Sequence, residues 1–295
     1  MYPLLRHGDK LPTVAALQIL LNRRQAEQIS VDGDFGLRTR VALENFQTEN
    51  RLSNTGEVNA RTWEALTRGH SLQVIDSIDC TDTKKLNRKE YTAKDGTVKH
   101  LPSNVDLLEN DGGNPIINFG MSNGRKHILN EIKRRGNRTP IVLLRFYGHG
   151  NPGYQQLASY KANYSSNIGG ALSKAEYDTQ MSSSFLHREL PKLVEEIRPL
   201  SNCFSEVGSI EFHGCKVGKG EVGRRFVTQM AQAFMRPVTA GIEYQYLSDY
   251  YTRGWGDYHI FHYEGPVFTA CPFRASLRNW ARAVSVTALP ASRTP

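Results

Sequence analysis

The sequence predicts two domains, a small all-α module of three helices followed by a larger α/β domain with a mostly parallel sheet. Three observations predict this fold class. Apolar residues recur at three- and four-residue steps near the start of the chain, two apolar runs of β-forming residues later lead into glycine-containing loops, and a long stretch of helical periodicity follows the second run. A chain of 295 residues, 39% hydrophobic and 22% charged, has room for both domains.

The amino-terminal module spans residues 1–70 and contains three short helices. The apolar face of the first helix repeats at helical steps through Val14, Leu17, Leu20 and Leu21. Thr13 is its expected N-cap. A second helix is expected around residues 41–46 and a third around residues 63–66. Between the first two lies a loop, residues 31–36, with two glycines and two aspartates, the composition of a tight turn.

The module resembles the peptidoglycan-binding family 1 repeat. Residues 14–22 match its VxxLQxxLN segment, residues 32–47 match DGxFGxxT followed by AxxxFQ, and Trp63 falls where that family has its last tryptophan. The resemblance implies a shallow groove for wall peptides and sugars, with Asp32, Asp34, Phe35 and Arg38 as candidate peptidoglycan-binding residues. The alternative is that most of these side chains build the fold.

The second domain is expected to follow a linker. Residues 71–115 mix Ser, Asp, Thr, Lys, Asn and Gly with few periodic apolar positions, so we expect a linker or an irregular lead-in segment there. The α/β domain then covers residues 116–295. Its expected elements are a helix at 124–135, a buried strand at 140–147, a strand at 209–212, a helix at 220–234 and a strand at 237–241. Strands alternating with helices favour a mostly parallel sheet.

Two residues that can perform catalysis, His149 and Cys215, each lie just past the end of an expected strand. Loops at the carboxyl ends of parallel strands meet in one crevice, so we expect the two residues to face each other. An imidazole beside a thiol raises the reactive thiolate fraction, which makes Cys215 the candidate nucleophile and His149 the candidate base. The alternative is that Cys215 is a small buried hydrophobe and His149 is structural.

Three neighbouring residues are candidate auxiliaries. Gly150 and Gly214 would let a substrate approach the backbone, and amide N–H groups of their loops could stabilise a tetrahedral oxyanion. His213 is a candidate second base or substrate contact, although it could equally shape the loop.

Residues 148–153 and 214–226 resemble the GHGxPG and GCxxGxGxxGxxF segments of caspase-like cysteine peptidases of clan CD. The resemblance covers roughly residues 138–245, and implies a caspase-like fold and a cysteine hydrolase with a His/Cys dyad that cleaves amide or peptide bonds. The caspase-type Gln-Ala-Cys string is replaced by His213-Gly214-Cys215, so substrate preference does not carry over.

A rival resemblance links His213-Gly214-Cys215 to the Ser-His-Gly-Cys motif of L,D-transpeptidases, which often carry the same amino-terminal module. Those catalytic domains are all-β, and Lys216 stands where the family has Arg or Asn. A wall-anchored protease and a non-enzymatic wall-binding adaptor are the remaining alternatives.

The expected partner is peptidoglycan, with an immunity protein or a secretion apparatus as further candidates. The four cysteines show no metal-binding spacing, so we expect neither a metal nor a cofactor. The net charge of +8 indicates a solvated surface, because no nucleic-acid motif accompanies it. No apolar run is long enough to span a membrane. No secretory signal is visible at residues 1–8. An antibacterial effector or lysin, acting in the periplasm or at the cell wall, would therefore arrive by a dedicated secretion machine or by lysis.

Overall fold

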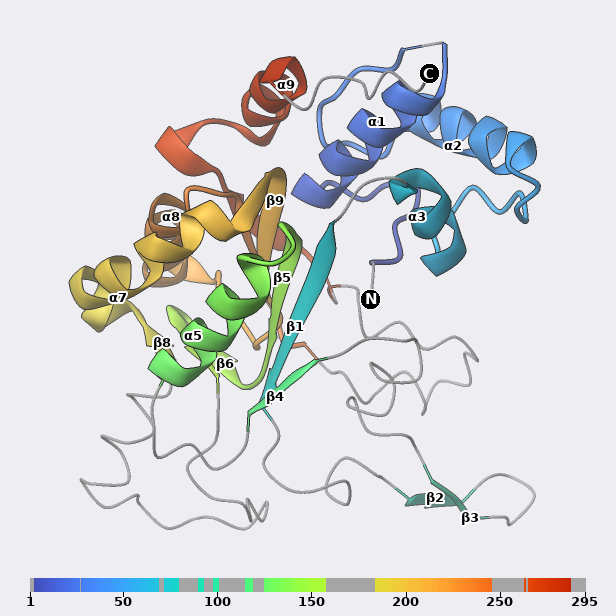
Figure 1. Cartoon of the computed structure of the whole chain (residues 1–295). Helices are drawn as coiled ribbons and strands as arrows, with labels where there is room; N and C mark the ends of the chain where they lie inside the picture. The colour runs from blue at the N-terminus through green and yellow to red at the C-terminus, as the bar shows by residue number, and fades with distance from the viewer. Residues whose placement is uncertain are drawn as a thin grey trace.

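A computed structural model describes residues 3–26, 28–68, 72–79, 90–92, 98–100, 115–118, 125–157, 184–245, 263 and 265–287. A helical module near the amino terminus, drawn in blue in Figure 1, lies next to a six-stranded sheet.

The three expected helices of the module are confirmed as α1 (Pro12–Arg24), α2 (Leu37–Glu49) and α3 (Ala60–Thr67). Their shared core consists of large apolar side chains that include Leu17, Leu21, Leu43, Phe46, Trp63 and Leu66. One detail differs from the prediction: Leu11 is the N-cap of α1 and Pro12 opens its first turn, so Thr13 lies inside the helix.

Two buried glutamines hold the loops of the module in place. The side-chain oxygen of Gln18 accepts hydrogen bonds from the backbone N–H groups of Asp32 and Gly33, both at 2.9 Å, and its Nε2 donates to Thr39 Oγ1 at 3.1 Å. Gln47 does the same between α2 and α3, where two backbone N–H groups donate to its side-chain oxygen at 3.1 Å. Polar residues of the repeat-like motif therefore stabilise the fold, because buried backbone donors need such acceptors.

The second domain is built on a sheet of strand order β11-β10-β9-β5-β1-β4. Its strands are β1 (Gln73–Asp79), β4 (Ile116–Asn118), β5 (Ile141–Tyr147), β9 (Phe204–Phe212), β10 (Val238–Gly241) and β11 (Val267–Ala270). Neighbouring strands are parallel, except for the antiparallel pair β10 and β11. The mostly parallel α/β sheet expected from the sequence is thus confirmed.

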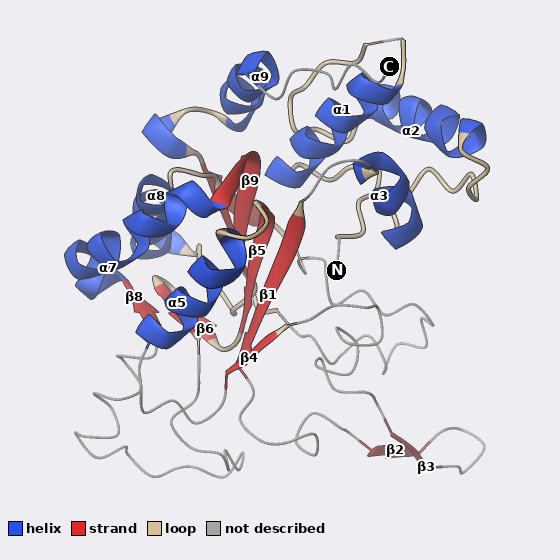
Figure 2. Ribbon diagram, in the orientation of Figure 1, coloured by secondary structure: helices blue, strands red, loops and turns tan. Residues whose placement is uncertain are grey.

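Helices cover both faces of this sheet. Helices α5 (Arg125–Gly136), α7 (Leu190–Ile197) and α8 (Gly220–Phe234) bury one face, and Figure 2 shows them grouped on one side of the strands. The opposite face packs against α1 and α9 (Leu277–Thr287). Burial on both faces is the usual state of parallel sheets and explains their continuous apolar runs.

Short elements complete the described part of the chain. They are the antiparallel pair of strands β2 (Glu90–Thr92) and β3 (Val98–His100), the small antiparallel sheet of β6 (Gly150–Asn151), β7 (Tyr154–Gln156) and β8 (Ser184–Leu186), and the 3₁₀ helices η1 (His187–Glu189), η2 (Arg198–Cys203) and η4 (Pro272–Arg274). None of the helices described combines the length and apolar character needed to cross a membrane.

Strand β1 corrects the expectation of an irregular segment directly after the module. It lies between β5 and β4 inside the sheet. Asp76 of β1 is only 3% exposed, and its two carboxylate oxygens accept hydrogen bonds from Arg145 of β5 at 2.6 and 3.0 Å. Asp76 interrupts the apolar pattern of this strand. Its carboxylate can be buried only because Arg145, on the neighbouring strand, pairs with it.

Helix α1 connects the two domains through a direct contact. Its Ala16 packs against Val142 and Leu143 of β5, and its Ile19 packs in a cluster with Trp280 of α9. The helix is therefore buried both on its module side and on its sheet side, and all ten residues 12–21 are buried. A helix with apolar residues on two sides is expected to be enclosed in this way.

Candidate functional site

The loops that follow β5 and β9 carry His149 and Cys215. The two strands are adjacent and parallel, and Phe146 pairs with Phe212 in their register. His149 and Cys215 each lie three residues beyond this pair, so the two residues leave the same edge of the sheet at the same level. In α/β proteins this edge is where ligands bind.

The two loops touch through their glycines. A Cβ atom on Gly150 would lie 2.7 Å from the carbonyl carbon of Gly214 and 2.8 Å from the backbone nitrogen of Cys215. A Cβ atom on Gly214 would lie 2.9 Å from the Cα atom of Gly150. No side chain fits at such distances, so both positions need glycine because the two backbones approach each other closely.

Gln155, which the sequence analysis did not single out, holds the two loops together. It lies on β7, paired with Gly150 of β6, and its side chain is fully buried. Its Oε1 accepts a hydrogen bond from the backbone N–H of Gly214 at 3.0 Å. The Gly214 amide is therefore already engaged by a side chain of the protein. A lone glutamine in a short strand gives no sequence signal for this contact.

A third loop, after β10, reaches the sulfur of Cys215. The backbone N–H of Gln245 donates to Cys215 Sγ at 3.4 Å, and the backbone N–H of Lys216 donates to the Glu243 carbonyl at 2.9 Å. Lys216 has a φ of 56°, and its ammonium group lies 3.4 Å from the centre of the Tyr244 ring. The thiol itself donates to the carbonyl oxygen of Gln245 at 3.6 Å, so both backbone groups of Gln245 contact the sulfur.

His213 is enclosed between two aromatic rings. It is 2% exposed, and its ring stacks on Tyr147 at 4.7 Å and on Tyr263 at 4.4 Å. Its Nε2 lies 3.0 Å from Glu211 Oε2. Because both ring faces and one nitrogen are occupied, these contacts favour the loop-shaping role over that of a second base or a substrate contact.

A row of buried polar residues crosses the sheet before these loops. Asp76, Arg145, Glu211 and Thr239 are register partners on β1, β5, β9 and β10, and none is more than 3% exposed. Burial raises the pKa of the adjacent Tyr147 well above its ordinary value, so its phenol stays neutral. Sequence inspection could not find the row, since each strand contributes a single member.

Of the four wall-binding candidates in the module, three are engaged within the fold. Phe35 is completely buried. A carboxylate oxygen of Asp32 accepts a hydrogen bond from the backbone of Asp34, and Asp34 itself forms an ion pair with Lys10 at 2.8 Å. Arg38 is the candidate that lines a cavity.

That cavity, of about 590 Å³, lies between the segment that directly follows α1 and the outer face of α2. Leu37 and Val41 present exposed apolar surface there, with exposed fractions of 68% and 47%. Polar groups around them come from Gln25, Gln28, Arg38, Asn45 and Glu49. Exposed aliphatic surface combined with amide and charged groups suits a ligand that has both apolar and hydrogen-bonding parts.

A metal centre finds no support in the described residues, where no cluster of three or more His, Cys, Asp and Glu side chains is arranged to hold an ion.

Comparison with known proteins characterises one part of the chain. A search of curated proteins found no match. A family model described as a putative peptidoglycan binding domain matches residues 10–66, which include α1, α2 and nearly all of α3. The chain therefore carries a peptidoglycan-binding domain at its amino terminus, consistent with action at the cell wall.

Proposed function

We propose that the protein is a peptidoglycan-binding cysteine hydrolase that cleaves amide or peptide bonds at the bacterial cell wall. The observation that carries the proposal is the contact between the Gly150 and Gly214 loops, which brings the segments of His149 and Cys215 together at the ligand-binding edge of the sheet. The amino-terminal domain would concentrate the enzyme on its substrate.

The proposed reaction follows from the two side chains. Cys215 Sγ attacks the carbonyl carbon of the scissile amide while His149 accepts the thiol proton, and the same imidazole then protonates the departing amine. Water next attacks the resulting thioester with His149 as base, which releases a carboxylate and restores the thiol. The backbone of Gln245 would hold the sulfur in place for the attack.

The environments of the described cysteines support Cys215 as the nucleophile. Cys203 and Cys271 are buried, and burial raises the pKa of both thiols, that of Cys271 to about 12. Cys215 is only partly buried and lies in a loop. A thiol that is accessible and hydrogen-bonded is better suited to attack than one enclosed by apolar side chains.

The fold helps to choose among the alternatives. An L,D-transpeptidase-like enzyme would have an all-β domain, whereas the second domain here has a mostly parallel sheet covered by helices. The α/β architecture and the position of the two loops favour the caspase-like alternative. Within this proposal the protein acts on the cell wall as an antibacterial effector or lysin, and an effector would be paired with an immunity protein.

The deciding experiment incubates purified peptidoglycan with the wild type, Cys215→Ala and His149→Ala, and identifies soluble fragments by mass spectrometry. Fragments are expected from the wild type alone, and pelleting with the wall should be the same for all three proteins. Identical fragments from Cys215→Ala would refute the cysteine mechanism. No fragments from any of the three, with normal pelleting, would refute wall hydrolysis and favour a wall-anchored protease or the non-enzymatic adaptor.

A further inference from the structure

The loops after β9 and β10 run side by side, and their contacts place a cation and an aromatic ring next to the proposed nucleophile. Cys215 Sγ contacts the backbone of Gln245, whose N–H donates to it at 3.4 Å. The neighbouring residue on each loop forms the adjacent contact, in which the ammonium group of Lys216 lies 3.4 Å from the centre of the Tyr244 ring. The ammonium group and the ring therefore belong to residues directly next to the thiol contact on both loops.

This pair is accessible, and the backbone of Lys216 is fixed. Tyr244 is 49% exposed, and Lys216 is partly exposed. The backbone N–H of Lys216 donates to the Glu243 carbonyl at 2.9 Å, and the Lys216 carbonyl accepts from the backbone N–H of Lys219 at 2.9 Å. Lys216 also has a φ of 56°, a conformation that costs free energy for a residue with a side chain. Backbone strain of this kind clusters at functional sites, so the direction of the Lys216 side chain is a candidate functional feature.

Lys216 has no carboxylate partner of its own. The carboxylate of Glu243, next to Tyr244 on the same loop, pairs with Lys219 at 3.2 Å instead. Within the part of the chain that the structure describes, no Asp or Glu side chain forms an ion pair with Lys216. The ring face stabilises the ammonium group, but a lysine has three N–H donors and one ring cannot engage them all. The cation can therefore bind an anionic group of the substrate beside the thiol.

We propose that Lys216 binds a free carboxylate next to the scissile bond, while the Tyr244 ring holds the ammonium group in position. The inference rests on the proposed hydrolase and deepens it by naming the substrate as a wall peptide that is anionic at the point of cleavage. Wall peptides are the substrate class because residues 10–66 form a peptidoglycan-binding domain. Stem peptides carry such carboxylates on γ-linked D-glutamate and on diaminopimelate, and a charged hydrogen bond distinguishes them from the neutral amide forms.

The test measures kcat and KM of the wild type and of Lys216→Met on synthetic stem peptides that differ only in charge. One peptide has free carboxylates on both D-glutamate and diaminopimelate, two have one of these groups amidated, and the last has both amidated. Amidation next to the scissile bond should lower kcat/KM of the wild type about tenfold, mainly through KM, because a charged hydrogen bond is lost. Lys216→Met should cleave all four peptides alike, and Lys216→Arg should restore the preference.

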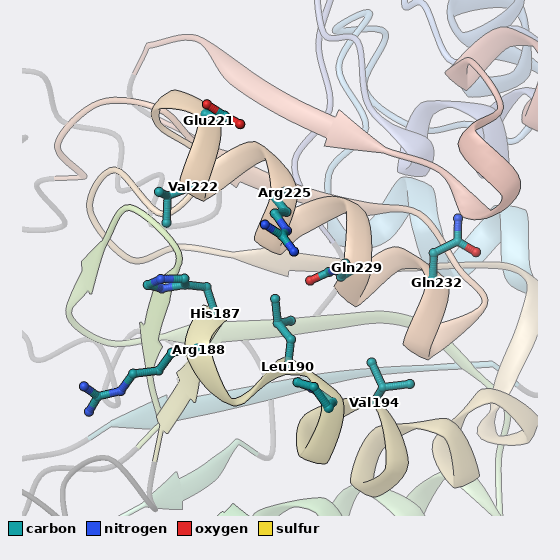
Figure 3. Close-up of a pocket in the computed structure, with 10 residues that line it drawn as sticks. His187, Arg188, Leu190, Val194, Glu221, Val222, Arg225, Gln229 and Gln232 are labelled. Carbon is teal, nitrogen blue, oxygen red and sulfur yellow. The ribbon is translucent and has the colours of Figure 1, made fainter.

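Two control variants keep Lys216 and remove other charges. The double variant Lys219→Met and Glu243→Gln removes the neighbouring ion pair as a whole, so no carboxylate is released to pair with Lys216. Arg225→Gln removes a positive charge from a separate cavity of about 600 Å³ between η1, α7 and α8, which Figure 3 shows. Lys216 does not line that cavity. Both controls should retain the wild-type preference for the free carboxylate.

Three outcomes would overturn the proposal. The first is equal kcat/KM of the wild type on all four peptides, and the second is an undiminished preference in Lys216→Met. The third is loss of the preference in Arg225→Gln as well, because net charge and not Lys216 would then select the substrate. If Lys216→Met slowed cleavage of every peptide by the same factor, its preference would be undiminished, and the lysine would act on the thiol instead of the substrate.

Failure of this inference is distinguishable from failure of the proposed hydrolase. Cleavage of no peptide by any of the proteins would refute the hydrolase, and the role of Lys216 would fall with it. Cleavage of charged and amidated peptides at equal rates would refute the role of Lys216 alone.

Discussion

Replacing Gly150 by alanine tests the closest contact of the candidate site. The added Cβ atom would lie 2.7 Å from the carbonyl carbon of Gly214 and 2.8 Å from the nitrogen of Cys215. Both are backbone atoms, so no flexible side chain can move aside and the two loops must separate. Overpacking of this kind typically costs about 1–3 kcal/mol. For a domain of this size the melting temperature should fall by about 2–12 °C.

The assay combines thermal unfolding with the rate at which iodoacetamide labels Cys215. In the proposed dyad, separated loops would also move the His149 base away from the thiol, so labelling should slow along with the loss of stability. Gly36→Ala is the control, because Gly36 has a φ of −82° and a Cβ atom there would meet nothing within 4 Å. If Gly150→Ala matched Gly36→Ala in melting temperature and labelling rate, the two loops could not be in contact.

Three further predictions concern single side chains. Gln155→Met should cost about 1–3 kcal/mol, because the buried Gly214 N–H loses its acceptor, and denaturant unfolding would measure it. At pH 8 Cys215 should label faster than Cys271, whose pKa near 12 leaves about one thiol in ten thousand ionised, and equal rates in peptide mapping would contradict the assignment. Two arginines lower the pKa of Glu131 to about 2. The stability that these ion pairs contribute is present above pH 4.5 and is lost on acidification toward pH 2. The loss of stability caused by Glu131→Gln, at most about 1 kcal/mol, should therefore vanish near pH 2.

The helical module was predictable because its signals are local. Apolar spacing and turn residues located all three helices within a few residues of their observed bounds. The roles of Asp32 and Phe35 were not predictable in the same way. A loop motif of this kind can contain ligand contacts and loop-building residues of the same types, and only the partners of Gln18 and the burial of Phe35 separate the two.

The second domain could be predicted only in part from local sequence patterns. Strands β5, β9 and β10 were located from their apolar runs, but β1, which contains Asp76, was assigned to a linker because residues 71–115 are polar with few periodic apolar positions. The ion pair that permits its burial joins residues 69 positions apart. His213 presents the same difficulty, since its stacking partners Tyr147 and Tyr263 come from other segments. In each case the deciding interaction is a tertiary contact between distant positions.

The sequence did contain a signal for the contact between the domains. Helix α1 is apolar on two sides, with Leu17 and Leu21 toward the module and Ala16 and Ile19 toward the sheet and α9. One apolar stripe would suffice for a module that stands alone.

Because α1 covers the sheet as well as the module core, the wall-binding module cannot be replaced without affecting the second domain. Removal of the module up to residue 68 would expose Val142 and Leu143. Replacement of the module by a foreign targeting domain would leave the same surface exposed. Such proteins should aggregate even when the new domain folds, because an uncovered apolar sheet face recruits other chains. Retargeting this protein to another cell envelope would require grafting a new groove onto α2 while leaving α1 intact.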